Sequence, residues 1–178
     1  YLYEHGYGVK QSYTRAIEWY KKAAAQNSAE AKHNLGMLAF QGYGMRKDYV
    51  AAKRFFTDAA SQDLPDSHYM LGLIYYQGHG VKTNPARARM HFLDAAKLGS
   101  PQGQFMTAVM FQGGEGHPAE KTEPLKAFIW GTVSKINGYP DADSILDFSK
   151  MQLAPSVQEK ATDLAQSCFE SGYTSCPS

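Results

Sequence analysis

Residues 31–60 read AKHNLGMLAFQGYGMRKDYVAAKRFFTDAA, and much of this pattern returns 36 residues later and again in the flanking sequence. The clearest mark is a Gly-x-Gly pair that recurs at that same interval. The four pairs are Gly6-Tyr7-Gly8, Gly42-Tyr43-Gly44, Gly78-His79-Gly80 and Gly114-Glu115-Gly116. A period of this size, with helix-like sequence between the marks, is typical of a solenoid.

Helical spacing is evident within the repeated unit. Ala31, Leu35 and Leu38 are three or four residues apart, so they share one face of a first helix. The Gly-x-Gly pair is expected to end this helix, because glycine readily adopts the positive φ of a tight turn. Asp48 and Asn84 are predicted to cap the second helix of their units at its N-terminus.

The second helix of each unit carries small and aromatic residues on its predicted buried face. One unit has Ala52, Phe55-Phe56 and Ala59-Ala60, while its neighbours have Trp19-Tyr20 and His91-Phe92 at the aromatic position. Gly36 and Gly72 lie in the middle of first helices, where glycine costs about 1 kcal/mol relative to alanine. Their presence predicts two helices that pass so closely that a Cβ would clash.

Each repeat is therefore predicted to be an antiparallel helix pair that stacks on its neighbours to bury both apolar faces. The expected fold class is all-α: an α/α solenoid, or superhelix, with a concave surface and a C-terminal capping helix. The repeat array is expected over residues 1–140, as a truncated first unit and about four units of 36–39 residues. A longer loop is expected over residues 117–124, and capping helices with a tail over residues 141–178.

The first residues, Tyr1 to His5, align with the ends of the later first helices. The chain is therefore expected to begin within a helix, with any earlier repeat or signal peptide upstream. The net charge of +1 and the lack of a basic run argue against nucleic-acid binding. No apolar run is long enough to span a bilayer, so direct membrane insertion is not expected either.

Two cysteines, Cys168 and Cys176, lie near the end of the chain. Gly172 between them is able to end a helix in the left-handed conformation and turn the chain back. A disulfide staple in an oxidising compartment is the favoured interpretation. Two unrelated thiols in a cytosolic protein are the alternative.

The repeated units resemble Sel1-like repeats, which are relatives of the tetratricopeptide repeat. The resemblance rests on the form Ala-x-x-x-Leu-Gly-x-Leu/Ile-x-x-x-Gly-x-Gly, followed by x-Ala-x-x-(Trp/Phe)-(Tyr/Phe)-x-x-Ala-Ala, as in Ala31 to Ala60. The departures are Ala39 for Tyr, His91 for Trp/Phe, and Thr107-Ala108 for Leu-Gly. The resemblance implies an α/α solenoid and an adaptor that holds other proteins, often in bacterial envelopes or secretory compartments. With the cysteine pair, it implies a periplasmic or secreted bacterial protein.

Catalytic and metal-binding patterns are sparse in this sequence. The Gly-x-Gly pairs follow helices rather than strands, so they are interpreted as turns and not as phosphate-binding loops. No Ser-x-x-Lys or Gly-x-Ser-x-Gly motif is present. The six histidines show no metal-ligand spacing, although His33 and His68 occupy equivalent helices of adjacent repeats and are expected to be able to approach each other. No catalytic residue, metal or cofactor is predicted.

A strip of side chains remains on the first helices after the packing positions are subtracted. Each unit supplies three residues at i, i+4 and i+7, which share one helix face. They are His33, Met37 and Phe40, then Tyr69, Leu73 and Tyr76, then Phe105, Val109 and Gln112, with Gln41, Gln77 and Gln104 expected at the edge. Exposed aromatics beside polar groups suit a peptide-binding surface. The alternative is that these side chains pack against the neighbouring second helix.

The sequence thus predicts a non-enzymatic adaptor that binds a protein or peptide along this strip, with Tyr69, Tyr76 and Phe105 as anchors. A β-lactamase-like or peptidoglycan-directed hydrolase is a second hypothesis, and it rests only on the family resemblance. A structural spacer within a longer array is a third.

Overall fold

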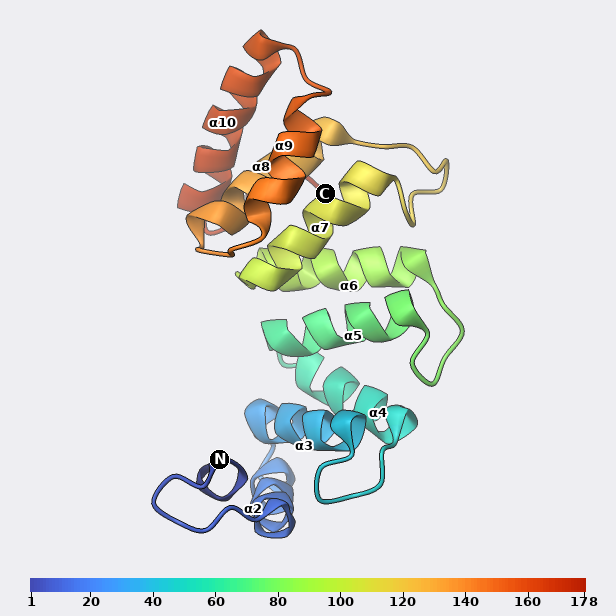
Figure 1. Ribbon diagram of the computed structural model, residues 1–178, viewed down its shortest axis with the longest axis vertical. Coiled ribbons are helices and arrows are strands. Elements are labelled where there is room, and N and C mark those ends of the chain that lie inside the picture. Colours follow the sequence, from blue (N-terminus) through green and yellow to red (C-terminus); the bar gives the residue numbers. More distant parts are fainter.

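The computed structural model describes residues 1–178 and contains ten helices and no strand, so the all-α expectation is confirmed (Figure 1). The helices are α1 Leu2–His5, α2 Tyr13–Ala25, α3 Ala29–Gln41, α4 Tyr49–Ala60, α5 Pro65–Gln77, α6 Pro85–Lys97, α7 Pro101–Gly113, α8 Pro124–Ile136, α9 Ala142–Lys150 and α10 Pro155–Glu170. They follow one another along the long axis of the molecule, from α2 at one end to α9 and α10 at the other.

Local sequence explains where the helices begin. The side chains of Asp48 and Asn84 accept hydrogen bonds from the backbone N–H groups of Ala51 at 2.9 Å and Arg87 at 3.0 Å. Both are N-caps, as expected, and they satisfy donors that the first turn of a helix leaves unpaired. Several helices also have proline in their first turn, where its missing N–H costs nothing. These are α5, α6, α7, α8 and α10.

The Gly-x-Gly pairs form the turns between the two helices of a unit. In all four pairs both glycines have positive φ. In the three later pairs the second glycine also meets the start of the second helix of the preceding unit: a Cβ on Gly80 would lie 2.8 Å from the Cβ of Tyr49. This turn is therefore also a contact between repeats, which explains why the pair recurs so strictly.

Consecutive helices pack as pairs, and the pairs stack. Within units α3 packs on α4, α5 on α6 and α7 on α8, and between units α4 packs on α5 and α6 on α7. The core is accordingly a series of small clusters along the array. This arrangement is that of a solenoid, in which each repeat contacts its neighbours.

The mid-helix glycines make room for one buried phenylalanine in each unit. A Cβ on Gly36 would lie 2.7 Å from Phe56, and a Cβ on Gly72 would lie 2.5 Å from Phe92. The close approach expected from the sequence is therefore present. The fourth unit departs from this pairing: it has Ala108 at the glycine position, and Gly131 follows Ala127 where Phe56 follows Ala52 and Phe92 follows Ala88.

Replacing Gly72 with alanine should lower the free energy of unfolding by about 1–2 kcal/mol, because the new Cβ overpacks a filled site against Phe92. The better helix propensity of alanine offsets this by about 1 kcal/mol at most. Equilibrium urea unfolding measures the difference. Gly113→Ala is the matched control, since its Cβ would meet only side-chain atoms of Glu115, the nearest at 3.5 Å. Equal stability of the two variants would contradict the close-approach interpretation.

The C-terminal helices close one end of the array. Both α9 and α10 pack on α8, and the absence of a side chain on Gly131 lets Ile145 and Leu146 of α9 come near. The predicted boundary between array and cap, after residue 140, falls in the connection between α8 and α9. Cys168 and Cys176 form a disulfide, and Gly172 between them has φ +62°, so the expected staple is present.

Candidate partner-binding surface

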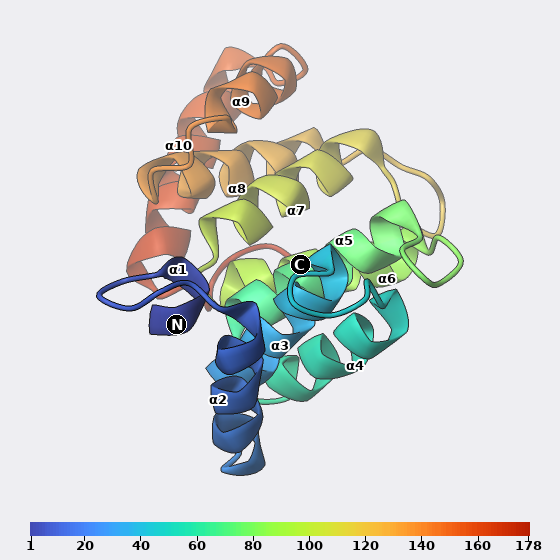
Figure 2. The ribbon, with the colours of Figure 1, turned by 60° about the horizontal axis from the view of Figure 1, so that its bottom comes forward.

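The predicted strip lies on three equivalent helices, α3, α5 and α7. These helices are the first members of successive pairs, and α5 also contacts α7 directly. Figure 2, which views the array from its N-terminal end, shows them as a staggered series. Eight of the nine strip residues are partly exposed: His33, Met37, Phe40, Tyr69, Leu73, Tyr76, Phe105 and Val109. Residues at the same repeat position are thus partly exposed on each of these three helices.

The strip aromatics also pack on neighbouring rings. The rings of Tyr69 and Tyr76 have their centroids 5.9 Å and 6.3 Å from that of Phe92, the buried phenylalanine of their own unit. Phe40 makes edge contacts with Tyr49 and His79. One side of each ring therefore packs against the array while part of its surface stays open. The two alternatives predicted from the sequence, packing and surface exposure, are therefore combined in the same side chains.

The two strip tyrosines keep their phenolic protons. Burial raises the pKa of Tyr69 and of Tyr76, and the nearby carboxylate of Glu115 raises that of Tyr76 further. The hydroxyl of Tyr76 donates to Glu115 Oε1 at 3.5 Å. Both hydroxyls therefore remain able to donate hydrogen bonds, as tyrosine hydroxyls do in many protein interfaces.

His33 occupies the N-terminal end of the strip. Its Nδ1 lies 2.9 Å from the hydroxyl oxygen of Ser67, which is fully buried. Burial lowers the pKa of His33, and the nearby Asp66 offsets this in part. His33 and Met37 also line a surface depression of about 550 Å³, together with residues of α1, α2 and the turns that follow α1 and α3.

Gln112 does not belong to the exposed strip. Only 6 % of its surface is exposed, and neither amide atom has a hydrogen-bond partner. Gln104, expected at the edge, is fully buried and donates to the carbonyl of Ala96 at 3.3 Å. Gln104 also accepts a hydrogen bond from Asn137 Nδ2 at 2.8 Å. Because α9 packs on α7 as well as on α8, the fourth unit is more enclosed than the internal ones. Gln41 and Gln77 are exposed, as expected.

Tyr139 is a residue that the repeat register did not indicate. It lies in the connection between α8 and α9, and its ring centroid is 5.0 Å from that of Phe105. It extends the aromatic strip at the C-terminal end. No periodic signal was available for it, because it follows the last repeat.

The contacts of the histidines differ from those expected from the sequence. His33 contacts Ser67 rather than His68, while His68 faces His91 and Asp94. His91 was expected to replace a core aromatic, and it is partly buried. The burial of this position differs between units: Phe55 packs against a core cluster and Trp130 is fully buried, whereas Trp19 is 57 % exposed. Phe92, the second residue of the pair, takes the core role.

These features define an α/α repeat solenoid with an open, aromatic-lined surface. Four successive segments match the Sel1 repeat model, at residues 1–28, 29–64, 65–100 and 101–131. The chain belongs to the Sel1 repeat family.

Solved structures of other repeat proteins share its fold. A Sel1 repeat protein from Oxalobacter formigenes is 26 % identical, with a TM-score of 0.78 over 94 % of this chain and 69 % of that one. The protective antigen c5321 of uropathogenic Escherichia coli, which displays an SLR fold, is 25 % identical with a TM-score of 0.85. The match covers 97 % of this chain but 37 % of that one. No curated protein matches the chain. None of its helices combines the length and apolarity needed to cross a bilayer.

Proposed function

We propose that the chain is a non-enzymatic adaptor that binds a protein or peptide segment along the strip of α3, α5 and α7. The observation that carries the proposal is the set of partly exposed apolar and aromatic side chains at equivalent positions of consecutive first helices. Such a surface offers repeated contacts to an extended partner. Tyrosine is enriched at interface hot spots, where a few anchors supply most of the binding energy.

The proposed compartment is the periplasm or the exterior of a bacterial cell. The Cys168–Cys176 disulfide supports it, since such bonds persist in oxidising environments. The bacterial sources of the two structural relatives support it as well.

The hydrolase hypothesis has one observation in its favour, the hydrogen bond between His33 Nδ1 and the hydroxyl of Ser67 at 2.9 Å. A nucleophile and its base lie at such a distance. Ser67 is fully buried, however, so a substrate carbonyl would need an opening to reach it. The hypothesis requires a covalent penicillin adduct on Ser67. The adaptor proposal instead requires an unchanged intact mass after incubation with penicillin.

Single alanine substitutions at Tyr76 and at Phe105 should each weaken binding to a strip ligand by more than about 1 kcal/mol, or about fivefold. A displayed random-peptide library selected on the intact chain supplies the ligands, and fluorescence polarisation measures their affinities. Loss of the aromatic ring removes an anchor whose open side the partner covers.

Thr57→Ala is the control for this experiment, because Thr57 is exposed on α4, outside the strip. Circular dichroism confirms that each variant is folded. Peptides that bind both strip variants as tightly as the unaltered chain would place the interface elsewhere and refute the assigned surface.

A further inference from the structure

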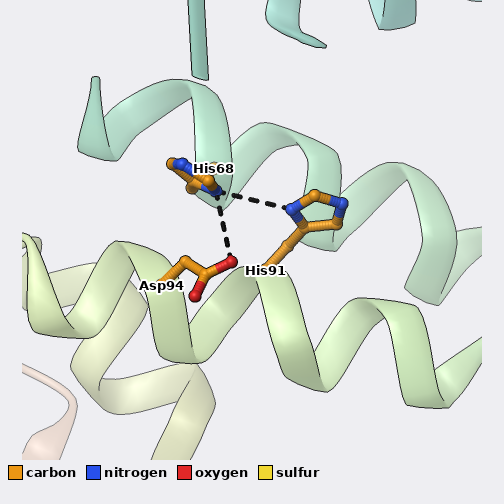
Figure 3. Close-up of side chains that lie close together, drawn as sticks. All are labelled: His68, His91 and Asp94. Carbon is orange, nitrogen blue, oxygen red and sulfur yellow. Dashed lines mark hydrogen bonds and ion pairs between the residues drawn. The ribbon is translucent and has the colours of Figure 1, made fainter. Parts of the chain in front are cut away.

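Two histidines and an aspartate converge between α5 and α6 (Figure 3). His68 Nδ1 lies 3.4 Å from His91 Nδ1 and 3.7 Å from Asp94 Oδ2. Donor atoms of all three side chains lie within 4.8 Å of one another. His91 and Asp94 are three residues apart on α6 and so share one helix face, while His68 reaches them from α5.

We propose that His68, His91 and Asp94 bind one divalent transition-metal ion, with Zn²⁺ as the best match. A tetrahedral zinc ion with Zn–N bonds of about 2.0–2.1 Å holds neighbouring donor atoms about 3.3–3.4 Å apart. The distances from His68 to the other two donors, 3.4 Å and 3.7 Å, are close to this value. Two imidazoles and one carboxylate suit zinc, whereas Mg²⁺ and Ca²⁺ prefer oxygen ligands alone.

The two rings are held in place by groups outside the cluster. His68 Nε2 lies 3.1 Å from the carbonyl oxygen of Ala60. That contact puts the proton of the neutral ring on Nε2 and leaves the lone pair of Nδ1 directed at the other two donors. A backbone carbonyl on the second ring nitrogen is a usual support for a metal-binding histidine. The His91 ring stacks on Tyr75, with centroids 5.6 Å apart and planes 4° apart.

Proton positions are consistent with metal binding. Without a metal, the contact between the two Nδ1 atoms requires a proton on one of them. Because His68 carries its proton on Nε2, His91 Nδ1 is the donor. Metal binding moves the His91 proton to Nε2, and both rings then bind as neutral imidazoles.

The cluster is accessible from the surface. His68 and Asp94 line a depression of about 390 Å³ whose other walls include Ser61, Asp63 and Lys97. The side chain of Asp94 is 44 % exposed, so its carboxylate is free to adjust toward an ion. No strip residue takes part in the cluster, and the metal site therefore stands independently of the proposed adaptor surface.

Isothermal titration of Zn²⁺ into the tag-free, disulfide-intact chain should show one ion per chain with a low-micromolar dissociation constant. His91→Phe, His68→Gln and Asp94→Asn should each weaken binding at least about tenfold, as loss of metal-supporting groups does. His91→Phe keeps the fold, because the equivalent position of another unit is Phe55. His5→Gln is the control, since His5 is exposed and distant in sequence from the cluster.

Saturating Zn²⁺ should also raise the melting temperature of the unaltered chain by several degrees but leave that of His91→Phe unchanged, because only the folded state assembles the three donors. Substitution of Co²⁺ should give the intense visible absorption of a tetrahedral site, and Mg²⁺ should give neither signal. A dissociation constant weaker than about 100 µM (about −5.5 kcal/mol) is ordinary surface-histidine affinity and overturns the proposal. Zinc binding unaffected by His91→Phe overturns it equally.

Discussion

Phe92→Ala should lower the free energy of unfolding by about 3–5 kcal/mol, the usual cost of removing a fully buried phenylalanine. None of the Phe92 surface is exposed. The ring fills the space that the missing side chain of Gly72 leaves open, and the rings of Tyr69 and Tyr76 pack against it. Since a domain is stable by only about 5–15 kcal/mol, this loss is a large part of the total.

Equilibrium urea unfolding followed by circular dichroism measures this loss. Met90→Ala on the same helix is the control: Met90 is 51 % exposed, and we expect a change within about 0.5 kcal/mol. Because each repeat contacts its neighbours, weakening the third unit should also loosen the coupling between the two ends of the array. A broader transition with a smaller m-value would report this uncoupling. A loss no larger than that of Met90→Ala would show that Phe92 does not hold the unit together.

The fold was predictable because its determinants are local and periodic. The second aromatic of each pair, as in Phe56 and Phe92, lies twenty residues after the mid-helix position of the same unit, and the structure places those two positions in contact. Gly-x-Gly marked the turns for the same reason: backbone conformation there depends on the residue itself. Because equivalent positions have similar surroundings in several units, a single substitution in one unit does not obscure the repeat pattern.

The candidate site was predictable only in part. Period and helix face identified which strip residues project from α3, α5 and α7, but they carry no information about what covers them. Gln112 has the same register as Phe40 and Tyr76, yet it is buried. The cap encloses the fourth unit, and Tyr139 joins the strip from outside the repeats. A terminal unit therefore has different neighbours from an internal one, and a prediction from the repeat period alone does not include this difference.

The His68–His91–Asp94 cluster escaped prediction for a different reason. His68 lies on the first helix of its unit and His91 on the second, 23 residues later, a separation that matches no short metal-ligand motif. The one sequence feature that pointed to the cluster is a histidine at an aromatic repeat position: His91 stands where the other units have Trp19 and Phe55. Knowing which first-helix position faces that residue requires the structure of at least one unit.

Removing the disulfide by Cys168→Ala with Cys176→Ala should lower the free energy of unfolding by about 2–3 kcal/mol, as the loop-closure entropy of a short loop indicates. Cys168 is buried in the cluster that contains Trp130 and Ala165. The bond also holds the tail in place, and Trp130 Nε1 donates to the carbonyl of Pro177 at 2.8 Å. Without the bond, the tail should detach and expose one edge of the indole.

Tail release has its own optical readout. The chain has two tryptophans, and a Trp19→Phe background leaves Trp130 as the only one. Acrylamide quenching of its fluorescence should rise in the double cysteine variant. Reductant should produce the same increase and the same loss of stability in the chain that keeps both cysteines, and it should have no further effect on the variant without them. A large stability loss with unchanged quenching would mean that the hydrogen bonds of the tail, rather than the disulfide, hold it on α8. Equal stability with and without the bond would show that the disulfide does not stabilise the fold. That result would also remove the main support for an oxidising compartment.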